Sequence, residues 1–242
     1  DLLVESLEIY KNRFGSNHPL TASAQADLGN LYRYTGHFEK SEELLRKALQ
    51  KRKELLGDDH PNTTQSLEDL AVVNWKLNKT EEAADLFDQA VSASLKFIND
   101  FFPPLSEVEK TQYWNQLKSR FYTFYNFAFE NADPELLNQV LRYRVATKGL
   151  LLNSSTKIKN TILSSDNEEL KELYRQWVDQ KRMLSSYYSL SREEIASQNI
   201  NIDSLEDAAN QSERKLSELS SEFTPDFVST DISTEDLAGK LK

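Results

Sequence analysis

Apolar and small side chains recur every three or four positions through the first hundred residues, which is the spacing of one face of an α-helix. This pattern predicts helices over residues 19–35, 39–56, 62–77 and 81–100, separated by short turns. Pro19 and Pro61 stand at helix starts, where a missing backbone N–H removes no hydrogen bond. The first hundred residues are therefore expected to form helical hairpins.

A repeat links these hairpins, because the phrase at residues 15–19 returns 42 positions later at residues 57–61, with His-Pro in both copies. At this offset the agreement lies at apolar and small positions, where packed helices touch. The aligned pairs are Leu28 with Leu70, Gly29 with Ala71, Leu31 with Val73, Ser41 with Ala83, Leu45 with Phe87, and Ala48 with Ala90.

The start of the chain fits the same period, since Leu44 aligns with Leu2 and Leu49 with Leu7. The chain is therefore expected to begin inside the second helix of an earlier repeat. Its first residue is Asp, and its only methionine is Met183. We expect it to be a piece of a longer protein.

A different pattern begins after residues 103–104, which are both proline. Residues 107–131 predict a long helix whose aromatic rings are too numerous to face water on more than one side. Asp133-Pro134-Glu135 predicts the start of another helix, which runs to about Leu152 or continues to Leu163.

The last third predicts a long helical hairpin. Ser165-Asp166 is expected to cap a helix with an apolar stripe from Leu170 to Tyr188. After a polar break at residues 197–203, a narrower stripe follows from Leu205 to Phe223 at coiled-coil-like spacing. Residues 224–225, Thr-Pro, are expected to end it, and a short helix is expected at 234–241.

Several residues of the first full unit have the types and spacing of a known helical repeat: Leu28, Gly29, Tyr32, Gly36, Phe38, Leu45 and Ala48. They resemble the tetratricopeptide repeat (TPR), and the 42-residue period resembles the longer variety found in kinesin light chains and many bacterial proteins. The second unit departs from this pattern at Asn74, Asn78 and Thr80. The resemblance implies an all-α fold, a TPR α-solenoid followed by the long helical-hairpin extension.

The resemblance also implies a binding groove, lined by the first helix of each hairpin. Exposed rings there would supply contact area, and charges would fix the register of a bound peptide. The implied groove residues are Asp27, Asn30, Arg33 and Tyr34, with Ser23 and Ala26 beside them, and Glu68, Asp69, Val72, Trp75 and Lys76 in the second unit. The alternative for each is ordinary solvated surface.

The segment beyond residue 100 carries a second resemblance. An aromatic helix, then Arg142-Tyr143-Arg144 and Lys148-Gly149-Leu150, then a charged hairpin resemble the region that joins repeats to the caspase-like peptidase of CHAT-domain proteins. This resemblance implies the recognition arm of a protease without its catalytic half. Arg142, Arg144 and Lys148 would dock an acidic neighbouring domain or the acidic C-terminal stretch, and the alternative is solvated charge.

These resemblances divide the chain into three parts. Residues 1–102 are expected to be TPR units, one partial and two full. Residues 103–164 form an aromatic helical pair that continues the solenoid, and residues 165–242 form the long hairpin with an acidic tail that leads to a missing C-terminal domain. The alternative is a free-standing TPR adaptor.

Charge and composition narrow the possible partners. The chain has 29 basic and 39 acidic residues and a formal net charge of −10, which disfavours nucleic acid and favours a basic peptide. No apolar run is long enough for a membrane span. Cysteine is absent from the chain, which favours a reducing compartment, so we expect a cytoplasmic protein.

Catalytic chemistry is not expected in this segment. The sequence contains no phosphate-binding glycine loop, no nucleophile elbow and no zinc-binding helix motif. His18 and His60 are copies of one repeat position, so a structural role at the turn explains them better than a metal site. We expect no cofactor, no metal, and a protein or peptide as the partner.

Overall fold

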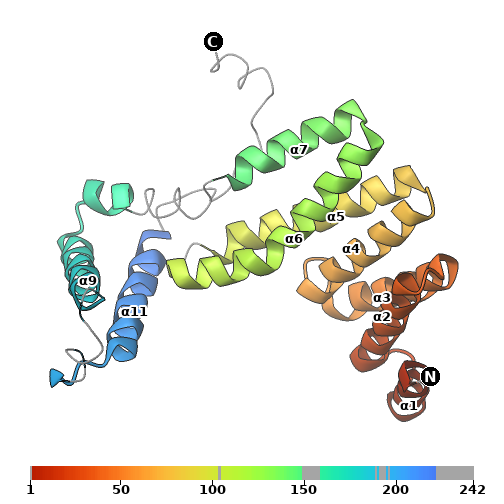
Figure 1. Ribbon diagram of the computed structural model, residues 1–242, viewed down its shortest axis with the longest axis horizontal. Coiled ribbons are helices and arrows are strands. Elements are labelled where there is room, and N and C mark those ends of the chain that lie inside the picture. The colour runs from red at the N-terminus through yellow and green to blue at the C-terminus, as the bar shows by residue number, and fades with distance from the viewer. Residues whose placement is uncertain are drawn as a thin grey trace. The chain divides into compact units, whose positions relative to one another are not determined.

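The computed structural model describes residues 2–102, 105–148, 159–188, 190, 195 and 197–221, and every regular element in these residues is a helix (Figure 1). The all-α fold class predicted from the sequence is confirmed. No helix among the described residues is both long enough and apolar enough to cross a membrane.

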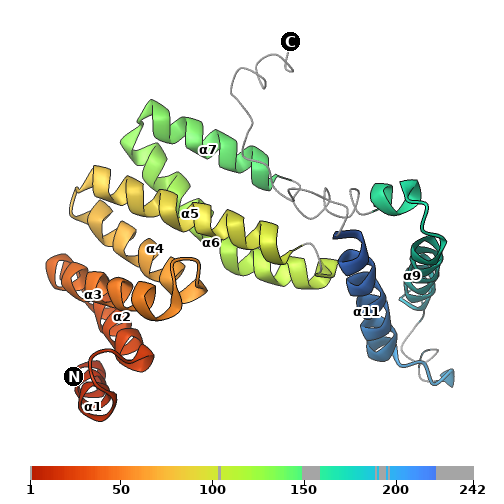
Figure 2. The same ribbon diagram turned by 180° about the vertical axis from the view of Figure 1, so that it is seen from behind.

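The helices follow one another along the chain with short connections at the N-terminal end (Figures 1 and 2). The five helices predicted between residues 19 and 131 correspond to α2 through α6, and each begins and ends within one residue of the observed bounds. The observed elements are α1 (Leu2–Phe14), α2 (Pro19–Tyr34), α3 (Phe38–Leu56), α4 (Pro61–Lys76), α5 (Thr80–Phe101), α6 (Glu107–Asn131), α7 (Pro134–Thr147), α9 (Glu168–Tyr187) and α11 (Ile202–Ser221).

The chain divides into two compact units. Unit 1 contains Asp1–Phe97 and Lys118–Leu141, and unit 2 contains Ile98–Leu117 and Arg142–Lys242. The helices α5, α6 and α7 each contribute residues to both units. The division into three consecutive segments stays a prediction.

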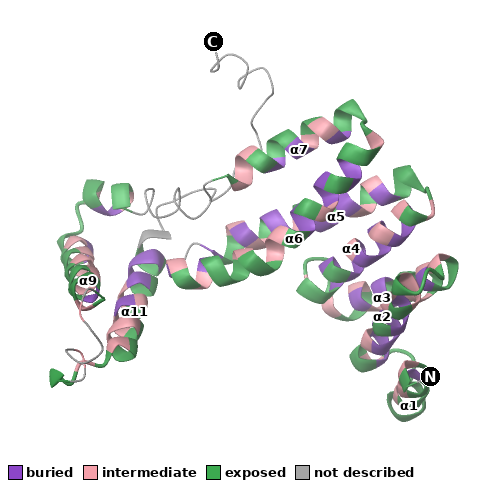
Figure 3. Cartoon of the chain, viewed as in Figure 1, coloured by how far each residue is buried: buried purple, intermediate pink, exposed green. Residues whose placement is uncertain are grey.

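The core of unit 1 follows the repeated positions. Leu28, Leu45, Leu70 and Phe87 are all 5% exposed or less, so the predicted seam between hairpins is confirmed. Figure 3 shows buried residues along α2, α3 and α4. A Cβ atom at Gly29 would lie 2.8 Å from Leu45 Cγ, so glycine allows α2 and α3 to approach closely.

The histidine of each repeated phrase caps a helix. His18 Nδ1 accepts a hydrogen bond from the Leu20 backbone N–H at 3.2 Å, and His60 Nδ1 accepts one from Asn62 at 3.1 Å. These bonds satisfy backbone donors that lack an intrahelical partner. The recurrence of His-Pro therefore has the structural basis that the sequence suggested.

A third hairpin, α6–α7, follows the first two in unit 1. The turns after α2, α4 and α6 each contain one residue in the left-handed region, Gly36, Asn78 and Ala132, with φ of 77°, 58° and 53°. The first two are 42 positions apart and the last two are 54 apart. The additional residues lengthen the helices, since α5 and α6 have 22 and 25 residues whereas α3 and α4 have 19 and 16.

In unit 2, α9 packs on α11 through a cluster that includes Leu170, Leu216 and Ile162, which agrees with the predicted helical hairpin. The predicted cap of α9 was wrong. Asn167 is the N-cap, and its Oδ1 accepts from the Leu170 N–H at 3.0 Å, whereas Ser165 hydroxyl donates to the Ile162 carbonyl.

Several predictions lie partly outside the described residues. The helix that starts at Pro134 ends at Thr147, and residues 149–158, which include the Gly149-Leu150 motif and Leu152, are not described. Phe223, the stop at 224–225, the short helix at 234–241 and the acidic tail also lie outside the described residues.

Candidate functional site

The first helices of the two full repeats are joined by side chains that the sequence placed in the groove. Asn30 on α2 donates from Nδ2 to Asp69 Oδ2 on α4 at 2.9 Å, and it accepts from Arg33 Nε at 3.1 Å. Asp69 is buried, and its other oxygen accepts from Gln65 at 3.1 Å. Three predicted groove residues thus form a hydrogen-bond chain between neighbouring hairpins.

A buried ion pair continues this chain from α4 to α6. Arg120 Nε lies 3.1 Å from Glu68 Oε2, and these side chains are only 9% and 13% exposed. The guanidinium also donates to Ser94 Oγ at 2.7 Å and to Gln65 Oε1 at 3.3 Å. Burial raises the pKa of Glu68, while Arg120 opposes that shift. Most of the polar capacity of Glu68 and Asp69 is therefore used to hold the helices together.

Two aromatic–cation pairs lie at the C-terminal ends of α2 and α4. The Arg33 guanidinium lies 4.4 Å from the ring centroid of Tyr34, and the Lys76 ammonium lies 4.4 Å from that of Trp75. The 42-residue period aligns Arg33 with Trp75 and Tyr34 with Lys76, so the two pairs occupy the same repeat positions with ring and cation exchanged. Tyr34 is 77% exposed.

The remaining groove candidates lie along the same two helices. Asp27 is exposed on α2, and Val72 is half-buried on α4. Trp75 is half-buried because its ring packs edge-on against Phe127 of α6, with centroids 5.7 Å apart. Peptide binding by these residues stays a prediction.

The first full repeat matches a model of a known repeat family. Residues 21–62 match the family model for the tetratricopeptide repeat. This match covers α2, α3 and the start of α4, which include Asn30, Arg33 and Tyr34.

Two of the similar solved structures are of one protein. The chain is similar to a crystal structure of nearly identical TPR-like repeats from a protein of Podosopora anserina assigned as a kinesin light chain, with 18% identity, coverage of 88% of this chain and 85% of that one, and a TM-score of 0.42. A single-residue variant of the same protein gives the same identity and TM-score, with coverage of 88% and 84%. None of the curated proteins compared with the chain matches it.

Three residues that join α4, α5 and α6 were missed by sequence reasoning: Gln65, Ser94 and Arg120. A usable signal was present, because Arg120 lies in the ring-rich helix α6, where a buried cation requires an acidic partner. The 42-residue period did not reveal the pair of Glu68 and Arg120, because α5 and α6 are longer than the helices of the earlier repeats and do not follow that period.

The predicted docking residues Arg142, Arg144 and Lys148 are exposed at the C-terminal end of α7. Positive side chains in this position interact favourably with the carbonyl end of the helix dipole. This role applies to Arg144 in the last turn of α7, and the docking of an acidic domain stays a prediction.

A second polar cluster lies in unit 2, where α6 begins. Glu213 of α11 is buried, and its Oε1 accepts from the Glu107 backbone N–H at 2.7 Å, so it caps α6 from a distant part of the chain. Lys181 of α9 lies 3.8 Å from the other carboxylate oxygen, and Arg214 pairs with Glu109. Burial raises the pKa of Glu213, although the bond from Glu107 opposes that shift.

Lys110 lies at this cluster, only 1% exposed, and burial lowers its pKa from 10.5 to about 8, against the opposing effect of Glu213. Because the folded-state pKa is depressed, the unfolding free energy of unit 2 should rise as the pH increases from about 8 to above 10.5. We expect Lys110→Met to stabilise unit 2 at neutral pH by about 2 kcal/mol and to remove that rise. Hydrogen exchange of α9 and α11 amides as a function of pH measures both effects.

The matched control is Lys215→Met, which removes an exposed lysine from α11. It should leave the stability and its pH dependence within about 0.5 kcal/mol of the parent. An unchanged pH profile in Lys110→Met would show that desolvation of Lys110 does not control unit 2.

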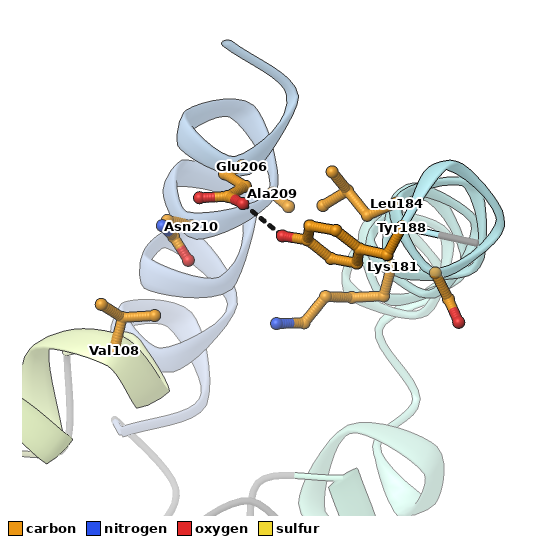
Figure 4. Close-up of a pocket in the computed structure, with 8 residues that line it drawn as sticks. Val108, Lys181, Leu184, Tyr188, Glu206, Ala209 and Asn210 are labelled. Carbon is orange, nitrogen blue, oxygen red and sulfur yellow. Dashed lines mark hydrogen bonds between the residues drawn. The ribbon is translucent and has the colours of Figure 1, made fainter. Parts of the chain in front are cut away.

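The described part of unit 2 also contains a small cavity between α9, α11 and the first turn of α6 (Figure 4). Its volume is about 230 Å³, and Leu184 and Ala209 line it together with Lys181 and Asn210. Tyr188 hydroxyl donates to the Glu206 carboxylate at its edge, and this bond raises the tyrosine pKa. Ligand sites usually occupy roughly 300–1,000 Å³, so this space suits one side chain better than a cofactor.

Proposed function

We propose that this chain is a protein-binding scaffold that holds a peptide against the exposed side of α2 and α4. The observation that carries the proposal is the pair of aromatic–cation contacts at equivalent positions of adjacent repeats, each with a cation-to-ring distance of 4.4 Å. Rigid rings supply contact area at low entropic cost, and TPR units commonly use this face to bind proteins.

The charges on this face indicate the chemistry of the peptide. Glu68 is neutralised by Arg120, and Asp69 is buried in the hydrogen-bond chain, so neither is well placed to attract a cation. The more exposed charged groups are Arg33, Lys76 and Asp27. A peptide with apolar side chains for the two rings and carboxylates for the two cations suits this face, although the net charge of the whole chain favours a basic partner.

The proposed scaffold performs no catalysis itself and serves a larger assembly. The resemblance of residues 101–242 supports the recognition arm of a CHAT-type peptidase, and the TPR match of residues 21–62 supports a free-standing cytoplasmic adaptor equally well. Reading the coding sequence beyond Lys242 separates the two settings, since a segment with a catalytic His and Cys supports the first and further repeats support the second.

The peptide-binding face can be tested with peptides selected against the full chain from a random display library. Tyr34→Ala combined with Trp75→Ala should weaken binding of the selected peptides by about 1,000-fold, because buried aromatic anchors contribute about 2 kcal/mol or more each. Isothermal titration calorimetry measures the loss, and circular dichroism checks that the helical content is retained.

Phe101→Ala is the matched control, since it removes an exposed ring, 56% exposed, from the far end of α5. It should leave the affinity unchanged. If the double variant bound the selected peptides as tightly as the parent while Phe101→Ala weakened them, the binding face would lie elsewhere.

A further inference from the structure

Three helices of unit 2 line the cavity shown in Figure 4. Val108 in the first turn of α6, Leu184 on α9 and Ala209 on α11 give it apolar walls. Lys181 on α9 and Glu206 on α11 add a cation and a carboxylate to the same lining. Apolar walls with a few convergent polar groups are the usual composition of a small-ligand site.

The Lys181 ammonium keeps hydrogen-bonding capacity for a ligand. Its Nζ lies 3.8 Å from Glu213 Oε2, and this separation is too long for a hydrogen bond. It also lies 5.7 Å from the centroid of the Trp177 ring. The side chain of Lys181 is 40% exposed, and an ammonium group has three N–H donors, so a carboxylate that enters the cavity can accept hydrogen bonds from it.

The Glu206 carboxylate forms an ion pair with no cation among the described residues. The Tyr188 hydroxyl donates to Glu206 Oε1, which leaves Oε2 for another donor. Because a hydroxyl group is neutral, this bond does not remove the negative charge. A ligand that carries an ammonium group can pair with Glu206 through a charge-assisted hydrogen bond.

An amide side chain lies beside this carboxylate. Asn210 lines the cavity one turn after Glu206 on α11 (Figure 4). Within the part of the chain that the structure describes, its side chain makes no hydrogen bond, although an amide has two N–H donors and an acceptor oxygen. The Asn210 amide can therefore bond to either charged group of a ligand.

The volume of the cavity sets the size of the ligand. A cavity of about 150 Å³ in another protein holds benzene, a molecule of six heavy atoms. The cavity in unit 2 is about 230 Å³, which at the same packing accommodates roughly nine heavy atoms. That is the size of a free aliphatic amino acid such as leucine.

We infer that this cavity binds a free aliphatic α-amino acid. The ligand's carboxylate pairs with Lys181, and its ammonium group pairs with Glu206. Its side chain lies against Val108, Leu184 and Ala209. An α-amino acid suits this lining because it carries opposite charges close together, beside one apolar group. The bound molecule links α9 to α11 and so stabilises unit 2, independently of the peptide-binding face proposed for α2 and α4.

Titration of L-leucine into the ¹⁵N-labelled full chain, followed by NMR, tests the binding. The amide signals of Leu184 and Ala209 should shift and saturate, with a Kd of about 1 mM or tighter for a ligand of this size. N-acetyl-L-leucine lacks the ammonium charge and L-leucinamide lacks the carboxylate, so each should bind at least about tenfold more weakly. Absence of a saturable shift, or an analogue that binds as tightly as L-leucine, overturns the inference. A tightly bound analogue would instead indicate capture of a peptide terminus.

Two variants test the roles assigned to the charges. Lys181→Met should weaken L-leucine binding about tenfold and leave the weaker binding of L-leucinamide unchanged, because leucinamide has no carboxylate for Lys181 to bind. Glu206→Gln should likewise weaken L-leucine about tenfold and leave N-acetyl-L-leucine unchanged. Lys215→Met, which removes an exposed lysine from α11, is the matched control and should bind L-leucine like the parent. Equal weakening of all three compounds by Lys181→Met would contradict a direct contact with the ligand carboxylate.

Discussion

Phe87→Ala is expected to lower the unfolding free energy of unit 1 by about 4 kcal/mol. Phe87 is fully buried, and its ring contacts Phe124 and Phe127 of α6 at centroid distances of 6.1 and 5.0 Å. The substitution therefore leaves a cavity at the junction between the second and third hairpins. Because each hairpin of a solenoid is stabilised by its neighbours, residues 118–141 should lose the most protection.

Urea unfolding followed by circular dichroism measures the loss, and hydrogen exchange of α6 locates it. Phe129→Ala is the matched control, since it removes the same side chain from an exposed position on α6. It should cost less than about 0.5 kcal/mol. Similar losses in both variants would show that Phe87 does not join the two hairpins.

Arg120→Met is expected to destabilise unit 1 by about 3–5 kcal/mol, because it leaves the buried carboxylate of Glu68 without its cation. Ser94 and Gln65 also lose their bonds to the guanidinium. The methionine fills most of the space of the arginine stem, so the effect reports the charge more than the volume.

The variant should also acquire a distinctive pH dependence. The pKa of Glu68 is already raised above 4.5 by burial, and it should rise further without Arg120. For a carboxyl group with a raised folded-state pKa, stability is present below the unfolded pKa and is lost as the pH rises through the folded one. The deficit in Arg120→Met should therefore be smaller in acid than at neutral pH.

Glu68→Gln in the Arg120→Met background is the decisive partner variant. A neutral amide removes the uncompensated charge, so the double variant should recover at least half of the lost stability and lose the acid-dependent recovery. Unfolding in urea across the pH range checks both outcomes. Additive losses in the double variant would mean that the two residues are not energetically coupled.

The sequence was sufficient for the first two full hairpins because their packing is periodic. The 42-residue spacing alone aligns Gly29 with Ala71 and Leu45 with Phe87. All four residues contribute to the observed packing. Pro19 and Pro61 also located the helix starts. Local sequence and tertiary contact favour the same structure here, which makes such helices predictable.

The third hairpin was harder to place, because its turn uses Ala132, a residue type that carries no left-handed preference. The spacing from Asn78 to Ala132 differs from the 42-residue period, so no alignment within the sequence reveals the equivalence. The cap at Asn167 was missed for a related reason, since Asp166 and Asn167 are both good N-cap residues and only the fold selects one.

The helices that carry the candidate site were predictable, but the contacts of its residues were not. Helix periodicity placed Asn30, Tyr34, Asp69 and Trp75 within the first helices, as observed, whereas their place in a groove was implied only by the resemblance to the TPR. The internal use of Asp69 and Glu68 depends on Gln65 and Arg120, which reach them across distances that sequence spacing does not encode. The charge available to a partner therefore became apparent only from the structure.

Hydrogen exchange of the full chain, with and without a library-selected peptide, tests the central claim most directly. If α2 and α4 hold the peptide through the Tyr34 and Trp75 pairs, protection should increase in the C-terminal turns of α2 and α4 and leave α9 and α11 unchanged. Protection confined to α9 and α11, with none at residues 30–36 and 72–78, would contradict a peptide-binding face on α2 and α4.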